Sequence, residues 1–162
     1  MAKEKILMGS DKGGFYLKEA IKEHLKEQGY EIEDVGTQDV ENPKLYYEVG
    51  EAAGKKISSG EFKKGILVCG TGMGMAITAN KFQGVYAAVC ESTYAAERSR
   101  EINDANILTM GAWMIGPVLG CAMADVFLNK GFTEGVDADR AAYLKKAKAN
   151  FVEVEKKAFA QK

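Results

Sequence analysis

A cysteine followed by a glycine-rich turn is the part of this sequence best suited to chemistry. After an apolar run come Cys69 and then Gly70, Gly72 and Gly74, in the segment GILVCGTGMGMA. Glycines permit a sharp turn with exposed N–H groups, and a helix beginning near Met73 adds partial positive charge, so the turn should attract oxyanions. The same field would favour the thiolate of Cys69, as a nucleophile or a proton carrier. The alternative is a buried cysteine that only packs.

Two other groups of polar residues could complete such a site. Asp11 and Lys12 lie in GSDKGG, directly after the first apolar run of the chain. Asp11 would either contact a ligand or cap the following helix, and Lys12 would either bind an anion or remain solvated. Asn103 lies in SREINDAN, where it would donate to a ligand oxygen or form an Asx turn.

The composition excludes several classes of protein. The chain has 22 Lys and Arg against 23 Asp and Glu, interspersed, so we expect no nucleic-acid partner. No segment approaches ~18 apolar residues and no signal peptide is evident, so we expect a cytoplasmic protein without a membrane partner. Three cysteines without paired spacing favour reduced thiols, and a single histidine excludes Ser–His triads and histidine-rich metal sites. We assign Cys90 and Cys121 to packing and His24 to the surface.

The elements that position these groups alternate between strand and helix. Hydrophobic periodicity predicts strands at 4–8, 30–35, 66–68, 85–89 and 107–110, and helices at 15–28, 47–58, 73–80, 93–103 and 117–130. The strand at 30–35 alternates like one near a sheet edge, whereas the three later strands suit burial on both faces. Five βα repeats predict one domain over 1–162 with a mostly parallel sheet, a Rossmann-like three-layer α/β/α sandwich. Ligands bind such sheets at the carboxyl ends of the strands, where Asp11 and Cys69 lie.

A long amphipathic helix is predicted at the C-terminus, over residues 137–161. Its narrow apolar seam consists of Leu144, Ala147, Phe151, Val154 and Ala158. One interpretation is that this helix packs on its own sheet. The other is that it embraces a second subunit, because little of the sheet remains uncovered after five βα units.

Three segments together resemble a known family. They are GSDKGGF, GILVCGTGMGMAITANKFQGVYAAVC and SREINDANILTMGA, and they are similar to ribose-5-phosphate isomerase B and galactose-6-phosphate isomerase over nearly the whole chain to about Gly131. The resemblance implies a Rossmann-like fold in a homodimer or homotetramer with active sites between subunits. It implies aldose–ketose isomerisation of a phosphorylated sugar without metal or other cofactor.

The resemblance also implies residue roles. Cys69 would be the base that moves a proton between adjacent carbons through a cis-enediolate, with Thr71 near the substrate oxygens. The backbone from Gly70 through Gly72 to Gly74, together with Asn103, would form the anion hole. Asp11 would contact sugar hydroxyls, and Tyr46 or Tyr47 would take the place of a family tyrosine.

Several positions depart from the family pattern. Lys12 stands where many members have histidine, Ile102 where they have the ring-opening histidine, and Trp113 where they have arginine. Of two phosphate-binding arginines near the C-terminus, Arg140 offers one, and Asp137 falls near the place of the other. The proton-transfer centre is thus retained while ring opening and the phosphate clamp have changed.

These departures lead to a hypothesis about the substrate. An isoleucine cannot exchange protons with a ring oxygen, so we expect a substrate that needs no ring opening, such as a tetrose 4-phosphate, with Lys12 and Arg140 supplying charge. The alternatives are an ordinary pentose- or hexose-phosphate isomerase, or a partner-dependent, non-catalytic subunit of a galactose-6-phosphate isomerase-like complex. A nucleotide-binding protein is less favoured, because the glycines read GxGxG rather than GxGxxG.

Overall fold

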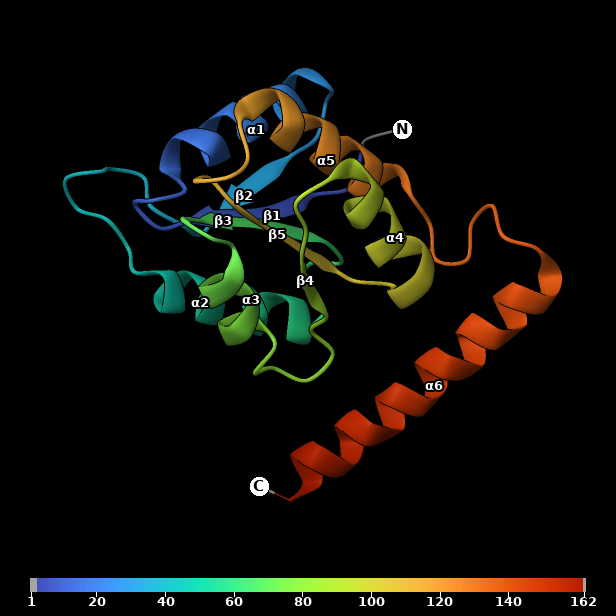
Figure 1. The fold of residues 1–162 in the computed structure, drawn as a ribbon. Helices are drawn as coiled ribbons and strands as arrows, with labels where there is room; N and C mark the ends of the chain where they lie inside the picture. Colours follow the sequence, from blue (N-terminus) through green and yellow to red (C-terminus); the bar gives the residue numbers. More distant parts are fainter. Residues whose placement is uncertain (1–2, 162) are drawn as a thin grey trace.

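Five parallel strands form one sheet in the order β2–β1–β3–β5–β4 (Figure 1). The structure, a computed structural model, describes residues 3–161. The strands are β1 (Ile6–Ser10), β2 (Ile32–Asp34), β3 (Gly65–Cys69), β4 (Ala87–Val89) and β5 (Ile107–Gly111). The helices are α1 (Phe15–Glu27), α2 (Tyr46–Ser58), α3 (Met73–Ala79), α4 (Thr93–Asn103), α5 (Pro117–Asn129) and α6 (Ala138–Ala160).

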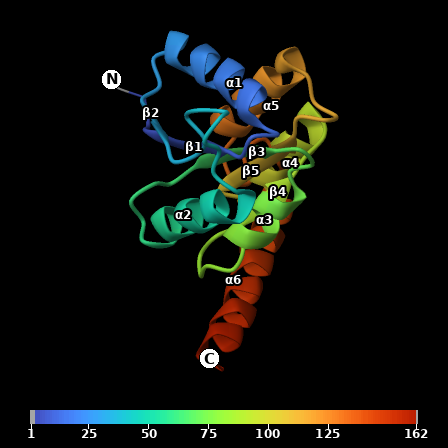
Figure 2. The same cartoon turned by 90° about the vertical axis from the view of Figure 1, so that its left-hand side faces the viewer.

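Helices cover both faces of the sheet and enclose two apolar cores. The first core lies beneath α1, α4 and α5 and takes Met8 and Ile66 from the strands; the second lies beneath α2 and α3 and takes Leu7 and Leu67 (Figures 1 and 2). Neighbouring strand residues enter opposite cores because successive side chains point to opposite faces. The predicted α/β/α sandwich with a parallel sheet is therefore confirmed.

Of the two edge strands of the sheet, one agrees with the prediction from the sequence and the other does not. β2 lies at an edge, as predicted. The prediction of a strand at 85–89 buried on both faces is wrong, because β4 is the other edge strand, comprises only Ala87–Val89 and ends in an exposed valine. Its alanines bring little apolar surface, whereas the larger side chains of β5 fill both cores from a central position.

Helix α6 diverges from the sheet and runs along one side of the molecule (Figures 1 and 2). Its contacts include α4 and the segment before β4. The Phe151 ring lies 5.1 Å from that of Tyr86, and Glu155 accepts hydrogen bonds from the hydroxyl of Tyr86 and the N–H of Gly84. The prediction that this helix packs on its own sheet is wrong. Part of its seam is uncovered, with Val154 66% exposed.

Local chemistry explains where several helices begin. Pro117 occupies the first turn of α5, where a missing N–H costs nothing. Ser92 caps α4 by accepting from the N–H of Ala95, and Asp137 caps α6 by accepting from the N–H of Arg140 at 2.9 Å. Within residues 3–161 every helix is too short or too polar to span a lipid bilayer.

Candidate active site

The carboxyl ends of β1, β3 and β5 lie side by side and bring three loops together. The register pairs Ser10 with Val68 and Cys69 with Gly111, so the loops that follow these strands begin at one level. A pocket of about 330 Å³ opens between them and the start of α2. It is lined by Asp11, Gly13, Tyr46, Cys69, Gly70, Thr71, Gly74 and Trp113.

Cys69 lies at the end of β3 and is 4% exposed. Its Sγ accepts a hydrogen bond from the N–H of Gly72 at 3.0 Å. Gly72 precedes α3 with φ at +79°, and a Cβ there would lie about 3 Å from the backbone of Met110. The turn therefore requires glycine at this position, and it aims a backbone N–H at the sulfur.

Aromatic rings cover the other two glycines of this turn. The ring of Trp113 lies against Gly70, and the ring of Tyr46 lies against Gly74, so a Cβ at either glycine would come within 2.7 Å of a ring atom. Trp113 is nevertheless 77% exposed. Thr71, between the two glycines, accepts a weak hydrogen bond from the N–H of Met73 at 3.3 Å. The pocket therefore has a backbone wall flanked by two aromatic side chains.

Asp11 is the carboxylate of the pocket. Its Oδ1 accepts from the N–H of Gly14 at 3.0 Å, but Gly14 is itself the N-cap of α1 and the helix has no side-chain cap. Asp11 therefore orders the loop before α1 and lines the pocket, and the expected capping of the helix by its side chain is wrong. Burial raises the pKa of Asp11, and the backbone hydrogen bonds from Gly14 and Gly13 oppose that rise. Lys12 is exposed on the same loop and forms no ion pair with any residue between 3 and 161.

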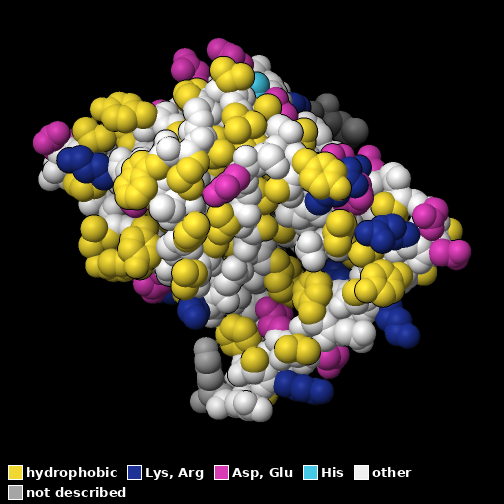
Figure 3. Space-filling view, in the orientation of Figure 1, with side chains coloured by type: hydrophobic (Ala, Val, Ile, Leu, Met, Phe, Trp, Pro, Cys, Tyr) yellow, Lys and Arg dark blue, Asp and Glu magenta, His cyan; other side chains and the backbone are white. Residues whose placement is uncertain are grey.

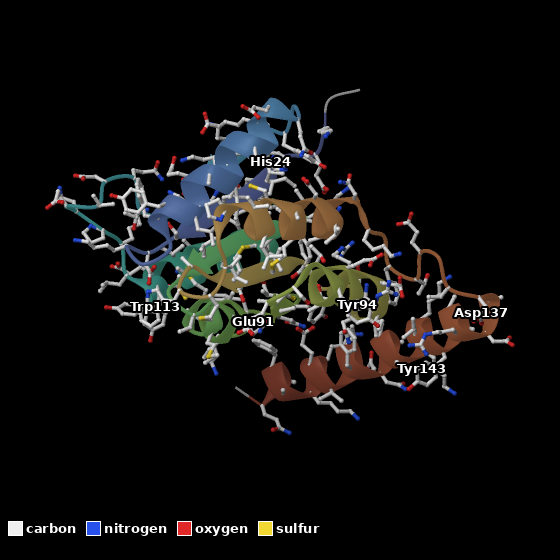
Figure 4. All side chains as sticks on the ribbon, turned by 45° about the horizontal axis from the view of Figure 1, so that its top comes forward. His24, Glu91, Tyr94, Trp113, Asp137 and Tyr143 are labelled. Carbon is white, nitrogen blue, oxygen red and sulfur yellow. The ribbon has the colours of Figure 1, made fainter. Side chains whose placement is uncertain are left out.

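Within one chain, Asn103 and Arg140 lie far from this pocket. Asn103 ends α4 just before β5, hence at the amino-terminal edge of the sheet, and Ile102 lies beside it. Arg140 is in the first turn of α6, exposed. Figure 4 shows Trp113 and Asp137, the cap of that turn, at opposite ends of the molecule. One chain therefore brings together Asp11, Cys69, Thr71 and the glycines, but not Asn103 or Arg140.

Part of the pocket lining was not predicted from the sequence. Gly13 was not singled out, although contacts explain both glycines that end GSDKGG: a Cβ at Gly13 would lie 3.2 Å from the Gly70 nitrogen, and one at Gly14 would lie 2.2 Å from the Val68 carbonyl oxygen. Trp113, which its place after the fifth predicted strand marked in addition to its replacing an arginine, lines the pocket. Tyr46, carried over with Tyr47 as an alternative, is the tyrosine that lines the pocket.

The remaining cysteines and the histidine lie elsewhere. Cys90 is buried and Cys121 half-buried, and burial raises the pKa of both thiols. His24, labelled on α1 in Figure 4, is half-buried rather than fully at the surface. Its Nε2 lies 2.9 Å from Oδ1 of Asp125, which links α1 to α5. No group of three or more His, Cys, Asp or Glu side chains in the described part of the chain is arranged to hold a metal ion.

Comparison with known proteins identifies the family. The family model described as Ribose/Galactose Isomerase matches residues 6–144. The chain belongs to this family. Its fold superposes on the Clostridium thermocellum ribose-5-phosphate isomerase B with a TM-score of 0.82 and 42% identity, over 95% of this chain and 99% of that one.

Two curated relatives in this isomerase family are named for sugars of four carbons. The 4-deoxy-4-sulfo-D-erythrose isomerase of Clostridium sp. (strain MSTE9) is 61% identical over 144 residues, 89% of this chain and 91% of the relative. The D-erythrulose-4-phosphate isomerase of Pectobacterium atrosepticum is 37% identical over 136 residues, 83% of this chain and 89% of the relative. The chain is accordingly a sugar isomerase of this family.

Proposed function

We propose that this protein interconverts the aldose and ketose forms of a four-carbon sugar that carries an anionic group at C4. Cys69 is the base, and the reaction passes through a cis-enediolate. The observation that carries the proposal is the position of the Cys69 sulfur, which lines the pocket beside the glycine turn and accepts the Gly72 N–H.

The chemistry follows from the groups of the pocket. Cys69 removes the proton from C2 of the open-chain aldose and returns it to C1, while the proton on O2 passes to O1, so the reaction needs no external reactant. Negative charge develops on these oxygens. Backbone N–H groups of the turn and of the first residues of α3, which have no acceptor within the helix, stabilise it. Thr71 supplies a hydroxyl beside the same oxygens, and Asp11 binds sugar hydroxyls.

The length of the substrate follows from the missing ring-opening residue. Ile102 occupies the position of the family's ring-opening histidine, and the pocket lining contains no histidine. A four-carbon aldose closes a furanose ring through its C4 hydroxyl, and a phosphate or sulfonate at C4 prevents that closure. Both curated relatives described above are named for such four-carbon substrates, which supports the proposal.

The charge of the pocket favours a sulfonate over a phosphate at C4. The lining contains a carboxylate and two aromatic rings but no lysine or arginine, and Lys12 is the neighbouring cation at the rim. A sulfonate carries a single negative charge, whereas a phosphate monoester carries about −1.5 to −2 near pH 7. Fewer cations therefore suffice for the sulfonate, and 4-deoxy-4-sulfo-erythrose is the preferred substrate.

A second copy of the chain completes the site. Large apolar side chains are exposed around the pocket end of the molecule, where hydrophobic groups gather on the left in Figure 3. They include Leu45, Tyr46, Tyr47, Met73, Ile77, Trp113, Met114 and Val118. Such a surface favours burial against another subunit. In the proposed homodimer, Asn103 of one chain joins the anion hole of the other, and Arg140 supplies the second cation.

Proton exchange in D₂O, followed by NMR, tests reaction and substrate together. 4-Deoxy-4-sulfo-D-erythrose should be isomerised fastest, D-erythrose 4-phosphate more slowly, and D-ribose 5-phosphate and D-galactose 6-phosphate least. Efficient turnover of ribose 5-phosphate would contradict the assignment of substrate length. Absence of turnover with every sugar, restored by a second homologous chain, would instead favour the partner-dependent subunit.

A further inference from the structure

A lysine ammonium is buried completely beside the candidate site. The side chain of Lys18, on α1, has no exposed surface. Its Nζ lies 2.7 Å from Oδ2 of Asp34 and 2.8 Å from Oε1 of Glu19, and it donates to the carbonyl oxygen of Thr37 at 2.5 Å. A buried cation is costly unless it is fully paired, so these contacts hold the segment from Asp34 to Thr37 in one place.

That segment braces the end of β1. The N–H of Thr37 donates to the carbonyl oxygen of Ser10 at 2.7 Å. Gly36 approaches so closely that a Cβ on it would lie 2.1 Å from the Ser10 nitrogen. Ser10 is the last residue of β1 and directly precedes Asp11, so the position of Asp11 depends on this contact.

The same threonine also holds the entry to α2. Its Oγ1 accepts from the N–H of Lys44 at 3.1 Å. Lys44 lies two residues before Tyr46, which begins α2 and covers Gly74 with its ring. Thr37 thus connects the segments that carry Asp11 and Tyr46, two residues of the pocket lining outside the glycine turn.

We infer that Lys18 is a positioning residue for the active site: acting through Thr37, its ammonium holds Asp11 and Tyr46 in place. The inference rests on the proposed function, in which Asp11 binds sugar hydroxyls in the pocket that Tyr46 also lines. Cys69 and its turn belong to β3 and α3 and are not held through Thr37. Loss of the ammonium should therefore weaken substrate binding more than proton transfer.

Lys22 provides a matched control on the same helix. Its Nζ contacts the same two carboxylates, Asp34 at 2.9 Å and Glu19 at 2.6 Å, and it forms no hydrogen bond with Thr37. Lys18→Met and Lys22→Met each remove one cation from the same cluster. The two variants therefore differ in the bond to the Thr37 carbonyl and in depth of burial.

Kinetics of these two variants on the best four-carbon substrate test the inference. Lys18→Met should raise KM at least about tenfold with kcat within about threefold, and Lys22→Met should leave both within about twofold. Asp11→Asn should raise KM by a smaller factor in the Lys18→Met background than in the wild type, because its carboxylate is already misplaced there. Equal KM in the two lysine variants, or equal factors in the two backgrounds, would overturn the inference.

Two further measurements keep the test decisive. If Lys18→Met does not fold, Thr37→Val keeps the buried ion pair and removes only the acceptor for Lys44, and an unchanged KM would refute the role. Amide exchange needs no substrate: the N–H groups of Thr37 and Gly14 should exchange faster in Lys18→Met than in Lys22→Met. A wild type inactive on all four-carbon sugars would defeat the proposed function alone, since this exchange result would stand.

Discussion

Replacing Cys69 by serine exchanges one buried sulfur for an oxygen and leaves the rest of the pocket intact. The side chain is 4% exposed and accepts one hydrogen bond, from the Gly72 N–H. Serine keeps an acceptor at that position, but its hydroxyl is far less acidic than a thiol and cannot serve as the base near neutral pH. The change therefore separates proton transfer from packing.

This substitution should lower kcat strongly and folding stability only slightly. A positioned general base contributes about 10²–10⁴ to the rate, so kcat should fall by that factor, equivalent to about 3–5 kcal/mol of transition-state stabilisation. Folding should lose only about 1 kcal/mol, since the Gly72 N–H keeps a partner, and Tm should fall by about 2–4 °C. Alanine would leave that N–H unpaired and cost more stability, about 1–3 kcal/mol.

The assay is deuterium incorporation from D₂O, followed by NMR, together with thermal unfolding of the same samples. Cys90→Ser is the matched control, because Cys90 is 3% exposed, lies outside the pocket lining and should lose similar stability while keeping activity. A Cys69→Ser enzyme within about tenfold of the wild-type rate would refute the role of Cys69 as the base.

Three further changes have defined outcomes. Gly14→Ala places a Cβ 2.2 Å from the Val68 carbonyl oxygen and should cost about 3 kcal/mol in urea unfolding; a loss under about 1 kcal/mol would contradict that contact. Burial raises the pKa of Asp11 above its ordinary 3.8. The wild type should therefore lose stability relative to Asp11→Asn as the pH rises through that raised value. A difference in unfolding free energy between the two proteins that stays constant from pH 3 to 7 would disprove it. Burial, with the hydrogen bond to Glu155, raises the pKa of Tyr86 to about 12, so Tyr86→Phe should lower stability by about 0.5–1 kcal/mol below pH 10, and the two proteins should converge as the pH approaches 12.

The sequence by itself determined the local elements and the centre of the site. Apolar periodicity located all five strands and six helices to within a few residues, because each pattern reports which face of an element is buried. The same patterns placed Asp11 and Cys69 at strand ends, and parallel strands bring those ends to one edge of the sheet. The hydrogen bond between Asp11 and the Gly14 N–H was also open to local reasoning, since it joins residues three apart.

Tertiary structure alone decided what depends on long-range pairing. The apolar run at 85–89 did not show that β4 is an edge strand, so only the fold shows β5 between β3 and β4. Contacts between distant segments placed Trp113 over Gly70 and Tyr46 over Gly74, and buried Lys18 against Thr37. The fold also set Asn103 at the opposite edge from Cys69 and turned α6 away from the sheet. Sequence spacing reports neighbours within a turn or a strand, whereas these positions follow from how separate elements pack.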